Sequence, residues 1–425
     1  MIQLRAESAA YGGYSIARDE GIVFLKGAIP GELVEATVVE KRKDYSVAVT
    51  KVVVEPSPSR VEPACPVFGI CGGCQMQHVE YAFQVEMKSS IIADSLVRLG
   101  GLDPQAVSAS RLEPISGGPL GYRRRAQLKI SPNGETGFFK EASREVIGVT
   151  NCPVLTAGLN DYLARLASFH PKGLKEIHLT EGDDGVMALL KGLDFDEDAA
   201  AAATAMGFAG VHFDDGSYLG RGHATFELPR RNGCLPGEAN PEGTSSETAP
   251  IKYTVSPTSF FQGNWNLNLR AVEAVKEALL PLEGKSVLDI YAGGGNFSLP
   301  LAGDSVKVVA VEENPSSAKD GMRNAQINGL EKFVRFINAG FEKAPLKGGF
   351  DLVIIDPPRP GLTKEAITKL AGLQPETIAY VSCNPSTLAR DLKRLSGKYA
   401  LASWRLIDFF PNTYHIETLC VLKRV

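Results

Sequence analysis

Long apolar runs are missing from this sequence of 425 residues. No stretch of about 18 uncharged apolar residues occurs, which is the length that a membrane-spanning helix requires. The opening segment, MIQLRAESAAYGG, has no apolar core of the signal-peptide type. We therefore expect a cytoplasmic protein without a membrane contact, and we expect it to act as a monomer.

The sequence also lacks a strong excess of charge, because 45 Lys and Arg residues stand against 49 Asp and Glu residues. A global positive field for nucleic acid is excluded, so any RNA contact must use local basic patches. Cysteine is scarce, with seven residues, and in a cytoplasmic chain we do not expect a disulfide framework. The spacing of the cysteines is more informative than their number.

The chain is too long for one core of ordinary size, and its length predicts about two to three domains. The first part consists of short alternating runs separated by Gly and Pro turns, which predicts a little barrel or sandwich of strands. These runs are 21–25, 33–39 and 46–54. The expected domains are a β unit at 1–58, a central α+β domain at 59–262 with a polar insertion at 228–250, and a third domain at 263–425.

Three cysteines stand close together in the segment ACPVFGICGGCQMQH. Cys65, Cys71 and Cys74 have the spacing C-x5-C-x2-C, and Cys152 follows far downstream. Four converging thiolates can hold a cuboidal iron-sulfur cluster. Zinc more often takes two C-x2-C pairs, and only one is present here. The pattern favours an iron-sulfur cluster over zinc, and buried apolar cysteines are the third reading.

Residues 81–99 have the apolar spacing of a helix, and residues 122–130 change to the alternation of a strand. The predicted buried stripe of the helix is Phe83, Met87, Ile91, Leu96 and Leu99. On the strand, the residues expected to face a core are Ala126, Leu128 and Ile130, and those expected to face outward are Arg123, Arg125, Gln127 and Lys129. This outer face is either solvated or a track for phosphate groups.

A glycine loop follows a predicted strand in the segment 286–302, SVLDIYAGGGNFSLPLA, an arrangement that binds nucleotide-type cofactors. Glu312 lies 19 residues after Gly293, where an acid that binds ribose belongs. A dinucleotide fits poorly, because Ser298 replaces a required glycine and Asp289 would repel a pyrophosphate. S-adenosylmethionine is cationic and carries no phosphate, so the loop favours it. A tight turn without a ligand is the alternative.

Strands and helical patterns alternate from residue 286 onward, which predicts a doubly wound parallel sheet of the Rossmann-like α/β class. The expected parallel strands are 287–290, 306–311, 333–337, 351–355 and 377–382. The last two runs, 401–409 and 416–422, have only a short turn between them. We therefore expect them to form an antiparallel pair at the edge of the sheet.

Chemically useful side chains follow the predicted strands of this sheet. Asp356 precedes two prolines and points a carboxylate toward the cleft. Cys383 lies at a strand-to-helix turn, where the helix field is expected to favour the thiolate, although a lone cysteine is more often structural. Near the end of the chain, His415 and Glu417 alternate onto one strand face, and either could be a general base. Gln262 lies between a predicted strand and helix, as a candidate or as an ordinary turn amide.

A thiol, a sulfonium cofactor and a base are what methylation of carbon 5 in a pyrimidine needs. Thiolate addition at carbon 6 makes an enolate that can attack the methyl group, after which a base removes the proton at carbon 5. Arg359 stands where methyltransferases of exocyclic amines have an aromatic residue, which disfavours that reaction.

Seven ordered motifs give the chain a close resemblance to the RNA 5-methyluridine methyltransferases, specifically the iron-sulfur kind that modifies 23S ribosomal RNA. They are ACPVFGICGGC with Cys152, SPTSFFQGN, DIYAGGGNFSLPLA, VEENPSSAKDGMRNAQING, DPPRPG, SCNPSTLARD and FPNTYHIETL. The segment GYSIARDEGIVFLKGAIPGELVEATV also resembles the TRAM domain, an OB-like barrel of RNA-modifying enzymes, with Lys41, Arg42, Lys43 and Tyr45 as candidate RNA contacts.

The resemblance implies a role for each matching residue. Cys383 would be the nucleophile and Glu417 the base. The expected ligands of a [4Fe-4S] cluster are Cys65, Cys71, Cys74 and Cys152. The expected contacts to S-adenosylmethionine are Gln262, Tyr291, Asn296, Glu312 and Asp356. The chain departs from the family at Ala292, which is usually cysteine, and at Gly340, which can supply a polar cofactor contact.

Two other functions stay open on the sequence alone. The first is the same reaction on the T loop of transfer RNA, because the family spans both substrates. The second is an RNA-binding protein with a vestigial cofactor fold, against which the intact Cys383, Glu417 and Asp356 argue.

Overall fold

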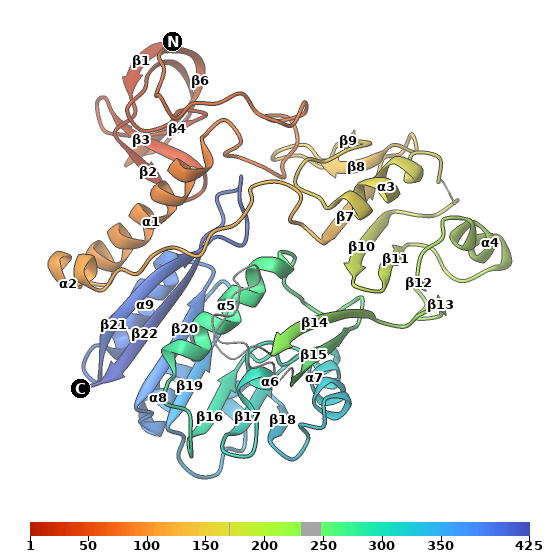
Figure 1. The fold of residues 1–425 in the computed structure, drawn as a ribbon. Helices are drawn as coiled ribbons and strands as arrows, with labels where there is room; N and C mark the ends of the chain where they lie inside the picture. The colour runs from red at the N-terminus through yellow and green to blue at the C-terminus, as the bar shows by residue number, and fades with distance from the viewer. Residues whose placement is uncertain (170, 231–247) are drawn as a thin grey trace, which may run out of the picture.

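The computed structural model describes residues 1–169, 171–230 and 248–425. Within these ranges the strands form one six-stranded sheet, two seven-stranded sheets and one two-stranded sheet. Figure 1 shows the amino-terminal sheet and the central sheet above the α/β part that contains the carboxyl terminus. Most of the predicted insertion at 228–250, with Cys234, falls outside the described residues. No helix in the described ranges is long and apolar enough to cross a membrane.

The amino-terminal sheet has the strand order β1-β5-β6-β4-β3-β2. Its strands are β1 (Ile2–Arg5), β2 (Ser8–Ala10), β3 (Tyr14–Arg18), β4 (Ile22–Lys26), β5 (Leu33–Lys41) and β6 (Tyr45–Glu55). Alternate residues such as Leu25, Val34 and Ala48 form its small core. The three predicted runs correspond to β4, β5 and β6, whereas the short strands β1, β2 and β3 were not predicted.

Two helices follow the linker, α1 (Tyr81–Arg98) and α2 (Pro104–Ala109). The helix α1 lies where the apolar spacing predicted it, and Met87 and Leu96 are buried as expected. Leu99 was assigned to the buried stripe wrongly, because it lies just after α1 and is 49% exposed. The buried face instead includes Gln84 and Lys88. Their polar side chains form hydrogen bonds with Asn412 and Asp408, near the end of the chain.

The central sheet has the order β13-β12-β11-β10-β7-β8-β9. Its elements are β7 (Arg125–Ile130), β8 (Thr136–Phe139), β9 (Val146–Gly148), α3 (Ala157–Leu166), β10 (Glu176–Gly182), β11 (Gly185–Lys191), α4 (Glu197–Ala205), β12 (Gly210–Phe213) and β13 (Tyr218–Gly220). Ala126 and Leu128 of β7 face the core of this part, as predicted. A hairpin of β14 (Ala224–Arg230) and β15 (Thr248–Val255) leads to the third part.

The third part is a doubly wound sheet of order β18-β17-β16-β19-β20-β22-β21. Its elements are α5 (Trp265–Ala278), β16 (Ser286–Ile290), α6 (Ser298–Leu301), β17 (Lys307–Glu312), α7 (Pro315–Ile327), β18 (Val334–Asn338), η1 (Phe341–Lys343), β19 (Leu352–Ile355), α8 (Lys364–Leu373), β20 (Thr377–Ser382), α9 (Pro385–Leu395), β21 (Tyr399–Ile407) and β22 (Glu417–Arg424). The strands β16 to β20 run parallel, and β22 pairs antiparallel with β20 and with β21. The predicted parallel sheet and antiparallel edge pair are confirmed.

Alternate residues of each central strand of this sheet belong to different hydrophobic clusters. Val287 of β16 packs in one cluster, and Leu288 and Ile290 pack in the other. The second cluster also contains Ile92 and Leu96 of α1. A helix from the first quarter of the chain therefore covers part of the carboxyl-terminal sheet, as Figure 1 shows for α1 beside β21.

The loop that joins β21 to β22, residues 408–416, is hereafter the terminal loop. Its Asp408 forms an ion pair of 2.7 Å with Lys88 of α1, and both side chains are buried, at 0% and 1% exposure. The side-chain amide of Gln84, on the same helix, donates a hydrogen bond to the Asn412 side-chain carbonyl and accepts one from the Asn412 backbone N–H. The Tyr122 hydroxyl donates a hydrogen bond of 3.0 Å to the carbonyl of Pro411. The loop is thus held by residues from two distant segments of the chain.

We predict that Lys88→Met lowers the free energy of unfolding by about 3 to 5 kcal/mol, because it leaves the buried Asp408 carboxylate without its partner. The double substitution Lys88→Met with Asp408→Leu is expected to recover much of the loss. Urea unfolding measures both. As a control, Arg98→Met breaks the exposed Arg98–Asp94 pair and should change the midpoint little. Equal losses in the single and double variants would contradict this account.

Candidate active site

The glycine loop lies at the carboxyl end of β16, beside the end of β17. Tyr291 and Ala292 donate backbone hydrogen bonds to the carbonyl of Val311. One carboxylate oxygen of Glu312 accepts a hydrogen bond of 2.8 Å from the Gly293 backbone, and the other accepts one from Asn314. Tyr291 has a positive φ of 66°. Glu312 therefore holds the loop in shape and sits where a ribose-binding acid was predicted.

A cavity of about 60 Å³ opens beside this loop. Of the predicted cofactor residues, four line it: Gln262, Tyr291, Asn296 and Asp356. They come from the segment before α5, from the glycine loop and from the end of β19. The fifth predicted residue, Glu312, does not line the cavity itself. It accepts a hydrogen bond from Gly293, which does. The structure thus brings the predicted set together.

Two further residues, one beside the cavity and one lining it, were not among the predicted site residues. Asn268 of α5 exchanges two side-chain hydrogen bonds with Asn296, of 2.7 Å and 3.0 Å, and so fixes the orientation of that amide. Phe260 also lines the cavity, and its side chain is 69% exposed. An exposed aromatic ring at the edge of a cavity is available for stacking, and only the folded arrangement reveals it.

Asp289 of β16 lies beneath the glycine loop and is 1% exposed. Burial raises its pKa to about 7, and the Ser298 hydroxyl donates a hydrogen bond of 2.5 Å to it. The prediction that its charge would repel a pyrophosphate treated it as an ionised group facing the loop. The structure instead gives it a supporting position, where it holds the first turn of α6.

Three reactive side chains lie together at the carboxyl ends of the parallel strands. Asp356 follows β19, Cys383 follows β20, and Glu417 begins the antiparallel β22. The register pairs Ser382 of β20 with Thr418 of β22, which are the chain neighbours of Cys383 and Glu417. The sequence assigned these residues separately, and the strand order of the sheet brings them side by side.

The Cys383 thiol is not activated in the way that its position in the sequence predicted. Burial raises its pKa to about 12, the carboxyl groups of Glu417 and Asp356 add to the rise, and the Arg359 guanidinium opposes it. Asn384 caps α9 by accepting hydrogen bonds from Ser386 and Thr387. The cap occupies backbone donors of the helix, and desolvation together with two acids outweighs the helix field.

The neighbouring carboxyl groups are perturbed in the same direction. Burial and then Asp356 raise the pKa of Glu417 well above its ordinary value, and Arg359 opposes this. Burial and then Glu312 raise the pKa of Asp356 to about 7. A carboxyl group with a raised pKa is a stronger base when ionised, which suits Glu417 to removing a proton.

His415 is a weaker candidate for the base. It lies in the terminal loop before β22, so it does not share a strand face with Glu417 as the alternation predicted. Burial and then Arg359 lower its pKa to about 4. Its ring contacts Tyr414 and Phe410, and its Nδ1 lies 3.3 Å from the Arg359 guanidinium.

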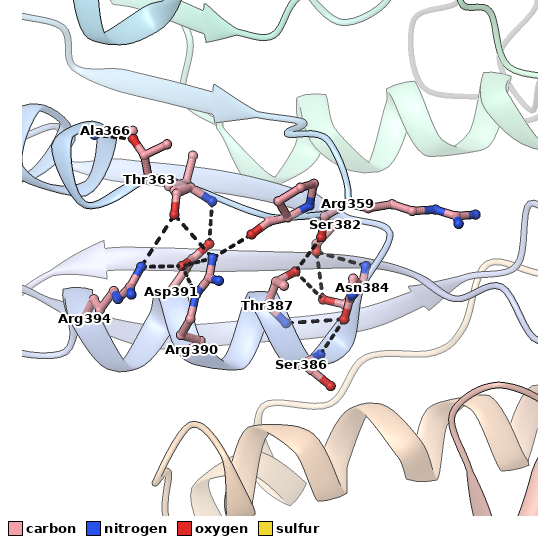
Figure 2. A network of polar contacts seen from close by, with 12 residues as sticks. Arg359, Thr363, Ala366, Ser382, Asn384, Ser386, Thr387, Arg390, Asp391 and Arg394 are labelled. Carbon is pink, nitrogen blue, oxygen red and sulfur yellow. Dashed lines mark hydrogen bonds and ion pairs between the residues drawn. The ribbon is translucent and has the colours of Figure 1, made fainter.

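Arg359 is placed by the loop after β19, which is fastened to α9 (Figure 2). The Thr387 hydroxyl donates to the Arg359 carbonyl, and Arg390 donates to the carbonyl of Pro360. The buried Asp391 accepts from the Leu362 backbone at 2.8 Å and from the Tyr380 hydroxyl at 2.9 Å. In Figure 2 the Arg359 side chain points away from this network. Its fixed backbone therefore aims the guanidinium toward His415.

The four predicted ligand cysteines lie around a second cavity, of about 410 Å³. Cys65, Cys71, Cys74 and Cys152 are all free thiols and all line it. In the part of the chain that the structure describes, no group of three His, Cys, Asp or Glu residues is close enough to hold a single metal ion. A cuboidal cluster binds each cysteine through a separate iron, so its thiolates surround a volume rather than one point. The four cysteines surround a volume in this way, because all of them line the cavity.

The outer face of β7 is not an open row of cations, which corrects the predicted phosphate track. Arg125 donates to the carbonyls of Ser259 and Phe261, and burial lowers its pKa. Lys129 forms an ion pair of 2.7 Å with Glu176. Arg123 lines the cysteine cavity and donates to the Arg125 carbonyl. Arg125 therefore holds β7 against the segment that contains Gln262, whereas Lys129 joins β7 to β10.

Comparisons with known proteins point to one family. Residues 246–425 match the family model described as tRNA (Uracil-5-)-methyltransferase. The chain is 34% identical to the 23S rRNA (uracil(1939)-C(5))-methyltransferase RlmD of Alkalilimnicola ehrlichii, over 96% of this chain and 92% of that protein. It is 33% identical to the protein of the same name from Shewanella sp. strain MR-4, over 97% and 93%.

A solved structure is similar over the same extent. The Pyrococcus abyssi tRNA (uracil-54, C5)-methyltransferase, in complex with S-adenosyl-L-homocysteine, has 25% sequence identity and a TM-score of 0.75. The similarity covers 99% of this chain and 100% of that one. The three-part arrangement, and not only the carboxyl-terminal sheet, is therefore shared with a methyltransferase.

We predict that Arg359→Met slows the alkylation of Cys383 by iodoacetamide at pH 8.5 about 2- to 10-fold. The thiolate is the reacting form, and removing the nearby cation raises the thiol pKa further. Because that pKa is already about 12 in the free protein, the rate should keep rising between pH 8 and pH 10. Peptide mass spectrometry follows Cys383 alone, and Lys393→Met on α9 is the control. An unchanged rate in Arg359→Met would contradict the proposed electrostatic contact.

Proposed function

We propose that this chain, which belongs to the RNA uracil-C5-methyltransferase family, transfers a methyl group from S-adenosylmethionine to carbon 5 of a uridine in RNA. The observation that carries the proposal is the meeting of Cys383, Glu417 and Asp356 at one sheet edge beside the glycine loop. These are the thiol and the base that the reaction needs, next to a site for the methyl donor.

The proposed substrate is 23S ribosomal RNA, modified by a cytoplasmic monomer. The relatives at 34% and 33% identity carry that substrate in their names over nearly the full chain. Transfer RNA is the second candidate, because the family model and the solved structure are named for it.

S-adenosylmethionine would lie against the glycine loop and supply a methyl group on a positively charged sulfur. Gln262, Tyr291, Asn296 and Asp356 are the residues that would hold it, together with Glu312 at the ribose position. The loop offers acids and amides but no Lys or Arg among the residues lining the cavity, which suits a cationic ligand without phosphate.

The reaction begins at Cys383, whose sulfur forms a bond to carbon 6 of the uracil. The electron pair of the 5,6 double bond moves toward the carbonyl oxygen at carbon 4, and carbon 5 then takes the methyl group. Glu417 removes the remaining proton from carbon 5, the double bond re-forms, and the carbon–sulfur bond breaks to release Cys383. Arg359 stabilises the negative charge on the thiolate.

The raised pKa of Cys383 in the free protein fits an enzyme that is activated on binding. Both acids that raise it, Glu417 and Asp356, lie where a cationic ligand would offset their charge. A positive charge nearby lowers the pKa of a thiol. The thiol thus stays protonated until the cation and the RNA are in place.

The four cysteines of the 410 Å³ cavity are proposed to hold a [4Fe-4S] cluster. The reaction above needs no electron transfer, so the role assigned to the cluster is structural. Cys74 is followed directly by Gln75 and Met76, whose backbone groups donate hydrogen bonds to the Asn412 carbonyl in the terminal loop. The segment 65–76, hereafter the cysteine loop, therefore supports the terminal loop that leads to Glu417.

The remaining assignments concern the division of the chain. We propose a TRAM-like barrel at 1–58 that binds RNA, a central iron-sulfur domain at 59–262 and a methyltransferase domain at 263–425. The candidate RNA contacts at the edge of the barrel lie at the end of β5, in the turn and at the start of β6: Lys41, Arg42, Lys43 and Tyr45. These residues are exposed, although Arg42 is paired with Glu40 and the Tyr45 ring packs against Phe24.

Two variants should fail at different steps of the reaction. The unmodified enzyme is expected to release tritium from RNA that carries uridine labelled at carbon 5. Cys383→Ala should bind RNA but form no covalent species. Glu417→Gln should still add the thiol and transfer the methyl group, yet accumulate a methylated adduct that survives a denaturing gel, because loss of a base typically costs about 10² to 10⁴ in rate.

His415→Ala is the control for the base, and ribosomal and transfer RNA fragments are tested in parallel. If His415→Ala traps the adduct while Glu417→Gln turns over, the base is misassigned. If the unmodified enzyme releases tritium from neither RNA, the proposed reaction is wrong.

The cluster makes a separate prediction. Protein purified without oxygen should be brown and contain about four iron and four sulfide per chain. Cys71→Ser should lose this colour and unfold at a lower urea concentration, whereas Cys420→Ser, a buried cysteine in β22, should keep the iron. Stoichiometric zinc without sulfide would refute the assignment.

A further inference from the structure

The turn between β2 and β3, residues 11–13, reaches from the amino-terminal sheet to the terminal loop. The ring of Tyr11 lies edge-on to the ring of Tyr414, with centroids 5.8 Å apart and an interplanar angle of 88°. A Cβ atom at Gly13 would lie 3.1 Å from the Cβ of Gln75 and 3.6 Å from the Cβ of Tyr414. The turn therefore touches both the cysteine loop and the segment that leads to Glu417.

The position of this turn is fixed by packing. Gly12 and Gly13 have φ angles of +98° and +82°, which side chains rarely adopt, so the tight turn depends on glycine. Ala9 of β2 packs against a small cluster of Ile29, Met76, Val79 and Met87. The space left between the turn, α1 and Tyr414 is only about 10 Å³. A gap of that size is at the lower limit for one water molecule, so the contact is close.

The Tyr11 side chain lies among the groups of the active site. Burial raises its pKa, the Arg359 guanidinium lowers it, and Tyr414, Cys383 and Glu417 raise it. Ring contacts connect Tyr11 to these groups, because the Tyr414 ring that it packs against lies 4.4 Å from the His415 ring, whose Nδ1 is 3.3 Å from the Arg359 guanidinium. The ring is half-buried, and its hydroxyl forms no hydrogen bond with any residue of the described ranges.

A half-buried hydroxyl without a protein partner, beside a nucleophile and a base, is suited to a polar ligand. Among the described residues, the hydroxyl is not one of the buried polar atoms that lack a partner, so it is open to solvent in the free protein and a ligand can reach it. When RNA binds, the nucleotide that faces Cys383 would displace water from the Tyr11 hydroxyl. Its raised pKa keeps the hydroxyl protonated, so it can donate as well as accept.

We propose that Tyr11 is a substrate-binding residue of the active site, whose ring packs on Tyr414 and whose hydroxyl hydrogen-bonds the uridine nucleotide presented to Cys383. The inference rests on the proposed function. It makes the amino-terminal sheet part of the catalytic site, in addition to any general role in holding RNA. Tyr11, near the start of the chain, and Glu417, in its last strand, would then contact the same nucleotide.

The test uses the full-length protein and RNA that carries 5-fluorouridine at the target position. Fluorine cannot be removed as a proton is, so the covalent adduct with Cys383 accumulates and its rate can be measured. Tyr11→Phe keeps the ring and removes only the hydroxyl. We expect its adduct to form about 3- to 10-fold more slowly, which is the effect of one hydrogen bond, with the unfolding midpoint unchanged. Tyr11→Ala, which also removes the packing, should be slower still.

The matched control is Tyr14→Phe, which removes a hydroxyl from β3, three residues along the chain. The Tyr14 ring faces Phe24 rather than Tyr414, at a centroid distance of 6.0 Å, so this variant should form the adduct at the rate of the unmodified enzyme. An equal slowing in both variants would overturn the proposal, because it would show a general effect on the sheet.

The remaining outcomes separate this proposal from the function on which it rests. If the unmodified enzyme forms the adduct and Tyr11→Phe forms it equally fast, the assignment of Tyr11 is wrong and the methyltransferase function stands. A Tyr11→Phe variant that changes only the unfolding midpoint is also against it, because a packing role would suffice. If the unmodified enzyme forms no adduct, both proposals fall together.

Discussion

The buried pair of Lys88 and Asp408 is the contact on which the arrangement of the three parts depends. It joins α1, which precedes the central sheet, to the terminal loop at the far end of the chain. Two charges out of water are tolerated only with good partners, and Lys88 also donates to the Phe410 carbonyl. Apolar packing would hold the helix on the sheet over a range of positions. The directional polar bonds of the loop select one of them, and with it the position of Glu417.

The active site brings three acidic groups together, and their raised pKa values show that burial and mutual repulsion disfavour their charged forms. Cys383, Glu417 and Asp356 are all desolvated, and each has a raised pKa, whereas Arg359 is the cation that acts on both the thiol and Glu417. Such an arrangement is costly in the free protein and becomes favourable when a cation enters. The same imbalance that weakens the thiol alone therefore provides selectivity for a positively charged methyl donor. Electrostatics and cofactor choice have one physical origin here.

Sequence patterns predicted the parallel strands from residue 286 onward and the antiparallel pair at the end of the chain, because alternation and strand-helix rhythm are local properties. The order of these strands in the sheet came only from the structure. The patterns also singled out Cys383 and Asp356, which follow predicted strands, and Glu417, which lies near the start of one. The roles of these residues stay predictions. The patterns failed where a residue's role depends on partners far along the chain. Arg125 was expected to face solvent and instead bonds Ser259 and Phe261, and the thiol pKa moved opposite to the helix field. No periodicity could indicate that Tyr11 meets Tyr414.

The cysteine loop and Glu417, the proposed base, are linked through one residue, Asn412. The Asn412 carbonyl accepts hydrogen bonds from Gln75 and Met76, directly after Cys74, and its side chain is bonded to Gln84 and to the Pro119 carbonyl. Asn412 itself adopts a φ of +66°, which Asn tolerates better than most side chains. Any change in the shape of the cysteine loop must therefore displace the segment that leads to Glu417. The proposed cluster would need no redox task to affect catalysis, because it would fix the loop that leads to Glu417.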